Sequence, residues 1–104
     1  MKRLALALFA ASWTGALAAT PPPGRAKSRP CMVCHGQLGI SITPDAPHLA
    51  GQPRIYLITQ LKAFRGGKRT SPVMNIIAKP LKDADISDLA EWYSSLKIEA
   101  REKP

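Results

Sequence analysis

Apolar residues recur at helical spacing near the end of the chain. In the segment DADISDLAEWYSSLK they lie three or four positions apart, at Ile86, Leu89, Ala90, Tyr93 and Leu96. A stripe with this spacing covers one face of an α-helix. Acidic residues in the first turn suit the positive end of the helix dipole. We therefore predict a C-terminal helix over residues 83–97.

A second apolar stripe follows Pro53. Leu57, Leu61 and Phe64 are separated by four and then three positions, and a pair of glycines closes the segment. Proline is favoured at the first position of a helix, and glycine just after its last turn. The pattern predicts a helix of about three turns over residues 53–67.

Proline and glycine interrupt helical spacing elsewhere. Residues 36–52 have no sustained periodicity and predict an irregular loop. Residues 66–82 are broken in the same way and predict a loop that carries the isolated Met74. Further upstream, TPPPGRAKSRP leaves room for at most about two turns of helix, starting at Pro23. Because no segment alternates with a period of two for long enough to form a strand, the predicted fold class is all-α with long loops.

The first 18 residues have the form of an export signal. The basic residues Lys2 and Arg3 precede the apolar run LALALFAASW, and residues 16–18 have the small-x-small pattern of a signal-peptidase site. We expect a Sec-type signal peptide over residues 1–18, cleaved after Ala18 or one residue later, and a periplasmic location. An uncleaved membrane anchor is the alternative, but the run is shorter than the roughly 20 apolar residues that span a bilayer.

Removal of the signal segment leaves 86 residues, enough for one small domain with a marginal apolar core. We expect a proline-rich leader at residues 19–30, the domain itself at residues 31–98 and a charged tail at residues 99–104. Without the signal segment, we expect no stable membrane insertion.

The chain is basic, with 15 Lys and Arg against 7 Asp and Glu. Export and the lack of a nucleic-acid-binding sequence pattern argue against nucleic acid as a ligand. We expect redox protein partners with an acidic docking surface, although a solvated surface that needs no partner is the other interpretation. Basic residues around the Met74 loop predict a positive collar that orients such a partner; they are Arg65, Lys68, Arg69, Lys79 and Lys82.

The most specific motif is CMVCHG, which contains both cysteines of the chain, Cys31 and Cys34, followed at once by His35. A disulfide is possible after export, but the βαβ pattern that accompanies thioredoxin-like motifs is missing. Zinc needs four ligands, and neighbouring residues such as Cys34 and His35 bind one ion with poor geometry. The C-x-x-C-H spacing is instead typical of covalent haem attachment, in which two thiols hold the porphyrin and the histidine binds the iron.

The second axial position of such an iron decides between electron transfer and chemistry on a small molecule. Met32 lies within the attachment motif and His48 in the loop that follows it, on the side where His35 is expected. Met74 lies on a separate loop, from which it could cover the far side of the ring. We therefore predict His35 and Met74 as the iron ligands, a pair that raises the reduction potential and closes the iron to oxygen and peroxide.

Four stretches of the sequence resemble class I cytochromes c, especially one half of the bacterial two-haem periplasmic cytochromes c and their single-haem relatives. They are CMVCHG, PHLAGQPRIYLITQLKAFRGGKR, PVM and PLKDADISDLAEWYSSL. The resemblance implies a small cytochrome c fold over residues 31–98, with helices and long loops around one covalent haem c. It implies thioether bonds at Cys31 and Cys34 and iron ligation by His35 and Met74. It also implies that the Pro47 carbonyl accepts a hydrogen bond from the second ring nitrogen of His35.

These observations predict a single-haem c-type cytochrome, not an enzyme, that carries one electron at a time between periplasmic or membrane-bound redox proteins. The alternatives are a haem-bearing electron-entry subunit of a dehydrogenase or oxidase complex, a haem peroxidase or gas sensor with an open iron, and a small binding module without cofactor.

Two departures from the family pattern affect the expected packing. The family has a fuller N-terminal helix that crosses the C-terminal helix, whereas PPPGRAKSRP is short and rich in proline. This difference argues against the crossing contact. Lys82 stands where family members commonly have a capping serine or threonine, so we expect capping to pass to Asp83.

Overall fold

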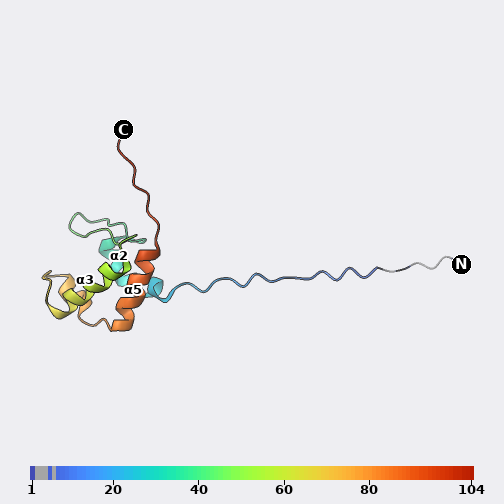
Figure 1. Cartoon of the computed structure of the whole chain (residues 1–104), viewed down its shortest axis with the longest axis horizontal. Helices are drawn as coiled ribbons and strands as arrows, with labels where there is room; N and C mark the ends of the chain where they lie inside the picture. Colours follow the sequence, from blue (N-terminus) through green and yellow to red (C-terminus); the bar gives the residue numbers. More distant parts are fainter. Residues whose placement is uncertain (2–4, 6) are drawn as a thin grey trace.

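The structure, a computed structural model, describes residues 1, 5 and 7–104 and is helical (Figure 1). Within these residues there is no strand, which confirms the predicted all-α class. The helices are α1 (Pro23–Lys27), α2 (Arg29–His35), α3 (Arg54–Gly66), α4 (Met74–Ala78) and α5 (Asp83–Ser95).

The expected signal peptide precedes all of the helices. Its basic residues Lys2 and Arg3 lie outside the described residues, and residues 7–22 run as an extended chain away from the helices (Figure 1). No helix in the described part of the chain is long and apolar enough to cross a membrane.

Helices α3 and α5 occur where the apolar stripes predicted them, within one or two residues at each end. Gly67 ends α3 in the left-handed conformation, at φ 77°. This conformation is accessible to glycine because it has no Cβ. The two helices pack against each other and bury Leu57 of α3 with Leu89, Ala90 and Tyr93 of α5.

Two parts of the helical structure differ from the prediction. Residues 66–82 were predicted as a loop, but they contain the five-residue helix α4, which packs against α3. Upstream, helix extends beyond the two turns expected from Pro23, because α2 follows α1 after Ser28 and continues to His35. Both short helices are held by contacts with other segments, which apolar periodicity does not reveal.

The crossing of the N-terminal and C-terminal helices is present, although the short proline-rich segment put this contact in doubt. Gly24 of α1 is buried against α5, where an added Cβ would overlap the Asp88 carbonyl and lie 2.7 Å from the Cβ of Trp92. Lys27 Nζ lies 2.9 Å from an Asp85 carboxylate oxygen and 2.7 Å from one of Asp88. Glycine allows the close approach, so one short turn is enough to form the crossing.

Asp85, not Asp83 as predicted, caps the start of α5. Its carboxylate accepts a hydrogen bond from the Lys82 backbone N–H at 2.9 Å. A carboxylate at the third helical position is well placed to reach back in this way. The Lys82 amide and then Lys27 lower the pKa of Asp85. Asp83 instead pairs with Arg65 of α3, at 2.7 Å.

Substitution of Gly24 tests the crossing. We expect Gly24→Ala to lower the free energy of unfolding by about 2 kcal/mol, because the added methyl group meets a backbone carbonyl that cannot rotate away. The measurement is chemical denaturation followed by circular dichroism.

Gly66→Ala is the matched control, since an added Cβ there has no atom within 4 Å. Its free energy of unfolding should stay within about 0.5 kcal/mol of that of the unsubstituted protein. Equal stability of the two variants would show that the close approach of α1 to α5 is not required.

Candidate functional site

Helix α2 places both cysteines of the motif and the following histidine together. Cys31 and Cys34 are separated by about one helical turn, and His35 lies four positions after Cys31. The helix ends at Gly36, whose φ is 81° and whose missing Cβ makes room for the backbone of Ile40. The turn therefore brings the next loop directly over the end of the motif.

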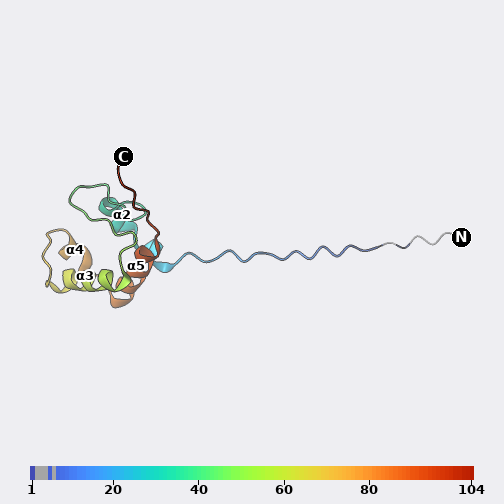
Figure 2. The same ribbon diagram turned by 45° about the horizontal axis from the view of Figure 1, so that its top comes forward.

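The three side chains line a cavity of about 710 Å³. Its wall is formed by α2, part of the loop after α2, one face of α3, the segment 69–74 with Ile77, and the inner face of α5. Figure 2 shows α3 and α4 side by side, with α2 on another side of the fold. Apolar side chains from several helices make up much of the lining, among them Leu49, Leu57, Leu61, Phe64 and Leu89.

The orientation of His35 is set by one hydrogen bond. Its Nδ1 lies 2.8 Å from the Pro47 carbonyl oxygen. Because a carbonyl can only accept, Nδ1 must carry a proton, so in the neutral imidazole the free lone pair is on Nε2. The residue is only 7% exposed. The arrangement presents one imidazole nitrogen that is able to bind a metal ion, with its ring held in place by the backbone.

Hydrogen bonds fix the loop that supplies Pro47. The Ser41 and Thr43 hydroxyls both donate to the Cys34 carbonyl, at 3.2 and 3.4 Å. His48 accepts a hydrogen bond at Nδ1 from the Ser41 backbone N–H, at 2.8 Å. This histidine is exposed and does not line the cavity. His48 therefore helps to hold the loop in place.

Met74, the first residue of α4, is half-buried and lines the same cavity as Cys31, Cys34, His35 and Pro47. Helix α4 packs on α3, and within the described residues it makes no contact with α2. The methionine thus reaches the cavity from a different part of the fold. Met32, the other methionine considered for this role, is not in the lining.

Tyr93 was predicted as a core residue of the C-terminal helix, but its part in the cavity wall was missed. Its ring is buried, and the hydroxyl lies near Ser28 and Cys31. Within the described residues the hydroxyl has no hydrogen-bond partner of good geometry. Burial raises the pKa of the Tyr93 hydroxyl and also that of the Cys31 thiol. A buried polar atom without a partner marks a place where a bound group could complete the hydrogen bonding.

Two further observations concern the disulfide and zinc interpretations of the motif. Cys31 and Cys34 are both free thiols in this structure. In the described part of the chain, no three side chains of His, Cys, Asp or Glu lie close enough to hold a metal ion. A structural zinc site needs four such ligands.

A sequence model of the cytochrome c family matches residues 24–97. The chain belongs to the cytochrome c family. This confirms the resemblance seen in the motifs, and the matched region begins at α1 and extends two residues past the end of α5.

Relatives within the cytochrome c family are of two sizes. A protein named thiosulfate dehydrogenase electron acceptor, from Thiomonas intermedia, is 42% identical over 96 residues, or 90% of this chain and 40% of that protein. Cytochrome c-554(548) of Halomonas halodenitrificans is 40% identical over 75 residues, or 69% of this chain and 90% of that protein. The solved structure of reduced recombinant cytochrome c4 from Pseudomonas stutzeri is 35% identical, with a TM-score of 0.70. That match covers 77% of this chain and 47% of the cytochrome c4 chain. This cytochrome c chain thus spans less than half of the larger relatives.

The cofactor of cytochromes c is haem c, an iron porphyrin bound covalently to the chain. The cavity suits such a group. It is large and apolar, and it brings together two thiols one helical turn apart, an imidazole with a free lone pair and a thioether from another helix. Soft sulfur and imidazole ligands match iron, and an apolar wall matches the porphyrin face.

Proposed function

We propose that this cytochrome c chain is a periplasmic carrier of single electrons between redox proteins, and that it has no catalytic reaction of its own. One observation supports this most directly: a single apolar cavity gathers Cys31, Cys34, His35 and Met74 from two helices that do not touch. The similarity to a protein named as an electron acceptor supports the same function.

In this proposal Cys31 and Cys34 hold haem c by thioether bonds, and His35 and Met74 bind its iron. Bound haem supplies a one-electron change between Fe(III) and Fe(II). The Pro47 carbonyl holds the His35 ring in one orientation, so the imidazole does not have to reorganise during transfer. Met74 would be the second protein ligand of the iron and would keep water, oxygen and peroxide from it.

The periplasmic location and the division of the chain into segments are also part of the proposal. Residues 1–18 act as the cleaved signal and residues 19–30 as a leader, although helix α1 and the start of α2 fall within that leader. Residues 31–98 form most of the domain, and residues 99–104 form the tail.

The proposed docking face surrounds the cavity mouth. Val33 and Val73 line the cavity and are 73% and 59% exposed, so an apolar rim faces the solvent. Of the predicted positive collar, Arg65 is neutralised by Asp83, and Arg69 stacks on Phe64. No ion pair forms at the other three members, Lys68, Lys79 and Lys82, within the described residues.

An acidic partner fits this face better than a neutral one. All four acidic side chains of α5 already pair with Lys27, Arg54 or Arg65 within the chain; they are Asp83, Asp85, Asp88 and Glu91. The charges of Lys68, Lys79 and Lys82, on the segments just before and after α4, are therefore available to an acidic partner and would steer its approach.

The thioether bonds are tested by substitution of the cysteines. We expect the double variant Cys31→Ser, Cys34→Ser to lose all haem on a denaturing gel. Each single variant should keep its haem. The absorption band of its reduced form should shift to longer wavelength, because one vinyl group stays conjugated with the ring. Val33→Ala is the control and should behave like the unsubstituted protein. A colourless protein, produced together with haem-attachment machinery, would contradict the proposal.

Met74 ligation is tested by Met74→Ala, with Met32→Ala as the matched control. Removal of the thioether should open the iron, so that the reduced variant binds carbon monoxide and the oxidised variant loses its sulfur-to-iron charge-transfer band. The reduction potential should fall, because a soft sulfur ligand favours Fe(II). If the unsubstituted protein bound carbon monoxide rapidly and fully at neutral pH, an open iron, and with it a peroxidase or gas sensor, would be the better interpretation.

Electrostatic steering is tested with hexacyanoferrate(III), an anionic electron acceptor. We expect the double variant Lys68→Glu, Lys79→Glu to be oxidised several-fold more slowly at low ionic strength, with the difference shrinking as salt is added. The control Lys97→Glu, Lys103→Glu has the same net charge but places the change on the C-terminal side of α5. Equal stopped-flow rates for the two variants would exclude local steering at the cavity mouth.

A further inference from the structure

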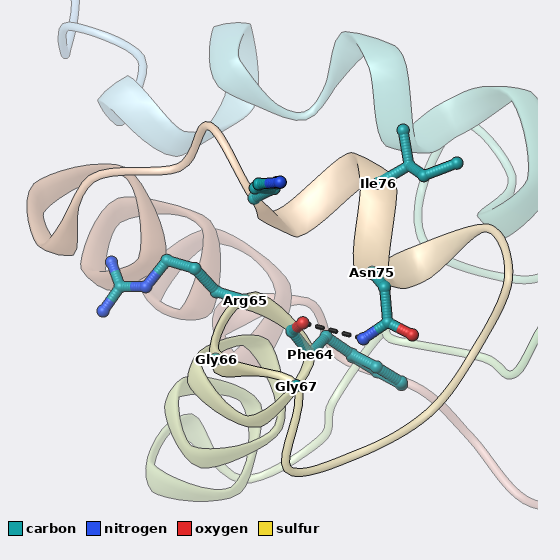
Figure 3. A pocket seen from close by; sticks show the side chains of 7 residues that line it. Phe64, Arg65, Gly66, Gly67, Asn75 and Ile76 are labelled. Carbon is teal, nitrogen blue, oxygen red and sulfur yellow. Dashed lines mark hydrogen bonds between the residues drawn. The ribbon is translucent and has the colours of Figure 1, made fainter.

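Asn75, the residue after Met74, makes three hydrogen bonds with its side chain. Its amide nitrogen donates to the carbonyls of Phe64 and Arg69, each at 2.8 Å. Its amide oxygen accepts from the Ser71 backbone N–H at 2.7 Å. Figure 3 shows the bond from Asn75 to Phe64, which links α4 to the end of α3.

These bonds connect three separate parts of the backbone. Phe64 lies in the last turn of α3, where its carbonyl otherwise accepts only the long 3.4 Å hydrogen bond from the Gly67 backbone N–H among the described residues. Arg69 and Ser71 belong to the connecting loop, and Asn75 itself is in α4. A primary amide has two N–H donors and one carbonyl oxygen, and all of them are used here. The side chain therefore fixes the loop and the start of α4 to α3 at once.

The position of Met74 depends on local contacts of this kind. A five-residue helix is far too short to be stable alone. Met74 also donates its backbone N–H to the Ser71 hydroxyl at 3.2 Å, so the segment that Asn75 holds is the one that holds Met74. Among the helices that the structure describes, α4 packs on α3 and on no other, so no second helix keeps the methionine at the cavity.

We infer that Asn75 is a positioning residue that keeps Met74 in the cavity wall and so sets how easily an outside ligand reaches the iron. This inference rests on the proposed function, in which Met74 is an iron ligand. Asn75 does not line the cavity, so its effect acts entirely through the backbone of the Met74 segment.

The test compares imidazole binding to the oxidised holoprotein in two variants. Asn75→Ala removes all three hydrogen bonds, and Asn75→Asp keeps an acceptor for Ser71 but sets a carboxylate against two carbonyls. An outside ligand binds in proportion to the fraction of molecules in which Met74 has moved away. We expect both variants to bind imidazole about tenfold to a hundredfold more tightly than the unsubstituted protein. Their sulfur-to-iron charge-transfer band should weaken at ambient temperature.

Lys27→Ala is the control, because it removes ion pairs between α1 and α5 and leaves the Met74 segment intact. It should leave imidazole affinity unchanged even where denaturation shows a loss of stability. If Asn75→Ala and Asn75→Asp bind imidazole no better than Lys27→Ala, while the unsubstituted protein shows the sulfur-to-iron band, the positioning role is wrong and Met74 ligation stands. If the unsubstituted protein lacks that band, the proposed function itself fails.

Hydrogen exchange gives a measurement that needs no variant. The Ser71 amide is protected by Asn75, so displacement of Met74 by saturating imidazole should speed its exchange in the unsubstituted protein. Unchanged protection of Ser71 in the imidazole complex would show that Met74 moves without the Asn75 contacts, and would overturn the inference.

Discussion

An apolar cavity that must be filled is the constraint on which the rest of this structure depends. Four of the five helices in the described part of the chain contribute to its wall, and the buried cluster between α3 and α5 is small. Apolar walls exposed to water are unfavourable by about 25 cal/mol for each Å². A domain of this size therefore relies on its covalent haem c as part of its interior.

Apolar periodicity predicted α3 and α5 well, because their stripes face the cluster and the cavity wall. The CMVCHG motif was equally informative about the family, since C-x-x-C-H is the spacing typical of covalent haem attachment. The sequence also indicated which residues meet at the cavity, because few thiols, imidazoles and thioethers are available. Tyr93 was recognised as apolar core, but nothing in its helical spacing indicated an unpartnered hydroxyl beside Cys31.

The features that were missed depend on contacts between distant residues. Helix α4 has too few residues for a periodic signal and is held by the side chain of Asn75. The crossing of α1 and α5 depends on the absence of a Cβ at Gly24, and a short proline-rich segment gives no sign of it. The cap of α5 was assigned to the wrong aspartate. Asp83 pairs with Arg65, whereas the Asp85 carboxylate accepts the hydrogen bond from the Lys82 amide.

The crossing of α1 and α5 has a consequence for the order in which the domain forms. Lys27 and Asp88 are 61 residues apart in the chain, and both lie at the contact between the first and last helices. The fold cannot close until the final helix has been synthesised, and a contact across so long a loop forms late. A nascent or truncated chain that ends before α5 would lack one wall of the cavity as well as the partner of α1. Completion of the domain thus requires both α1 and α5.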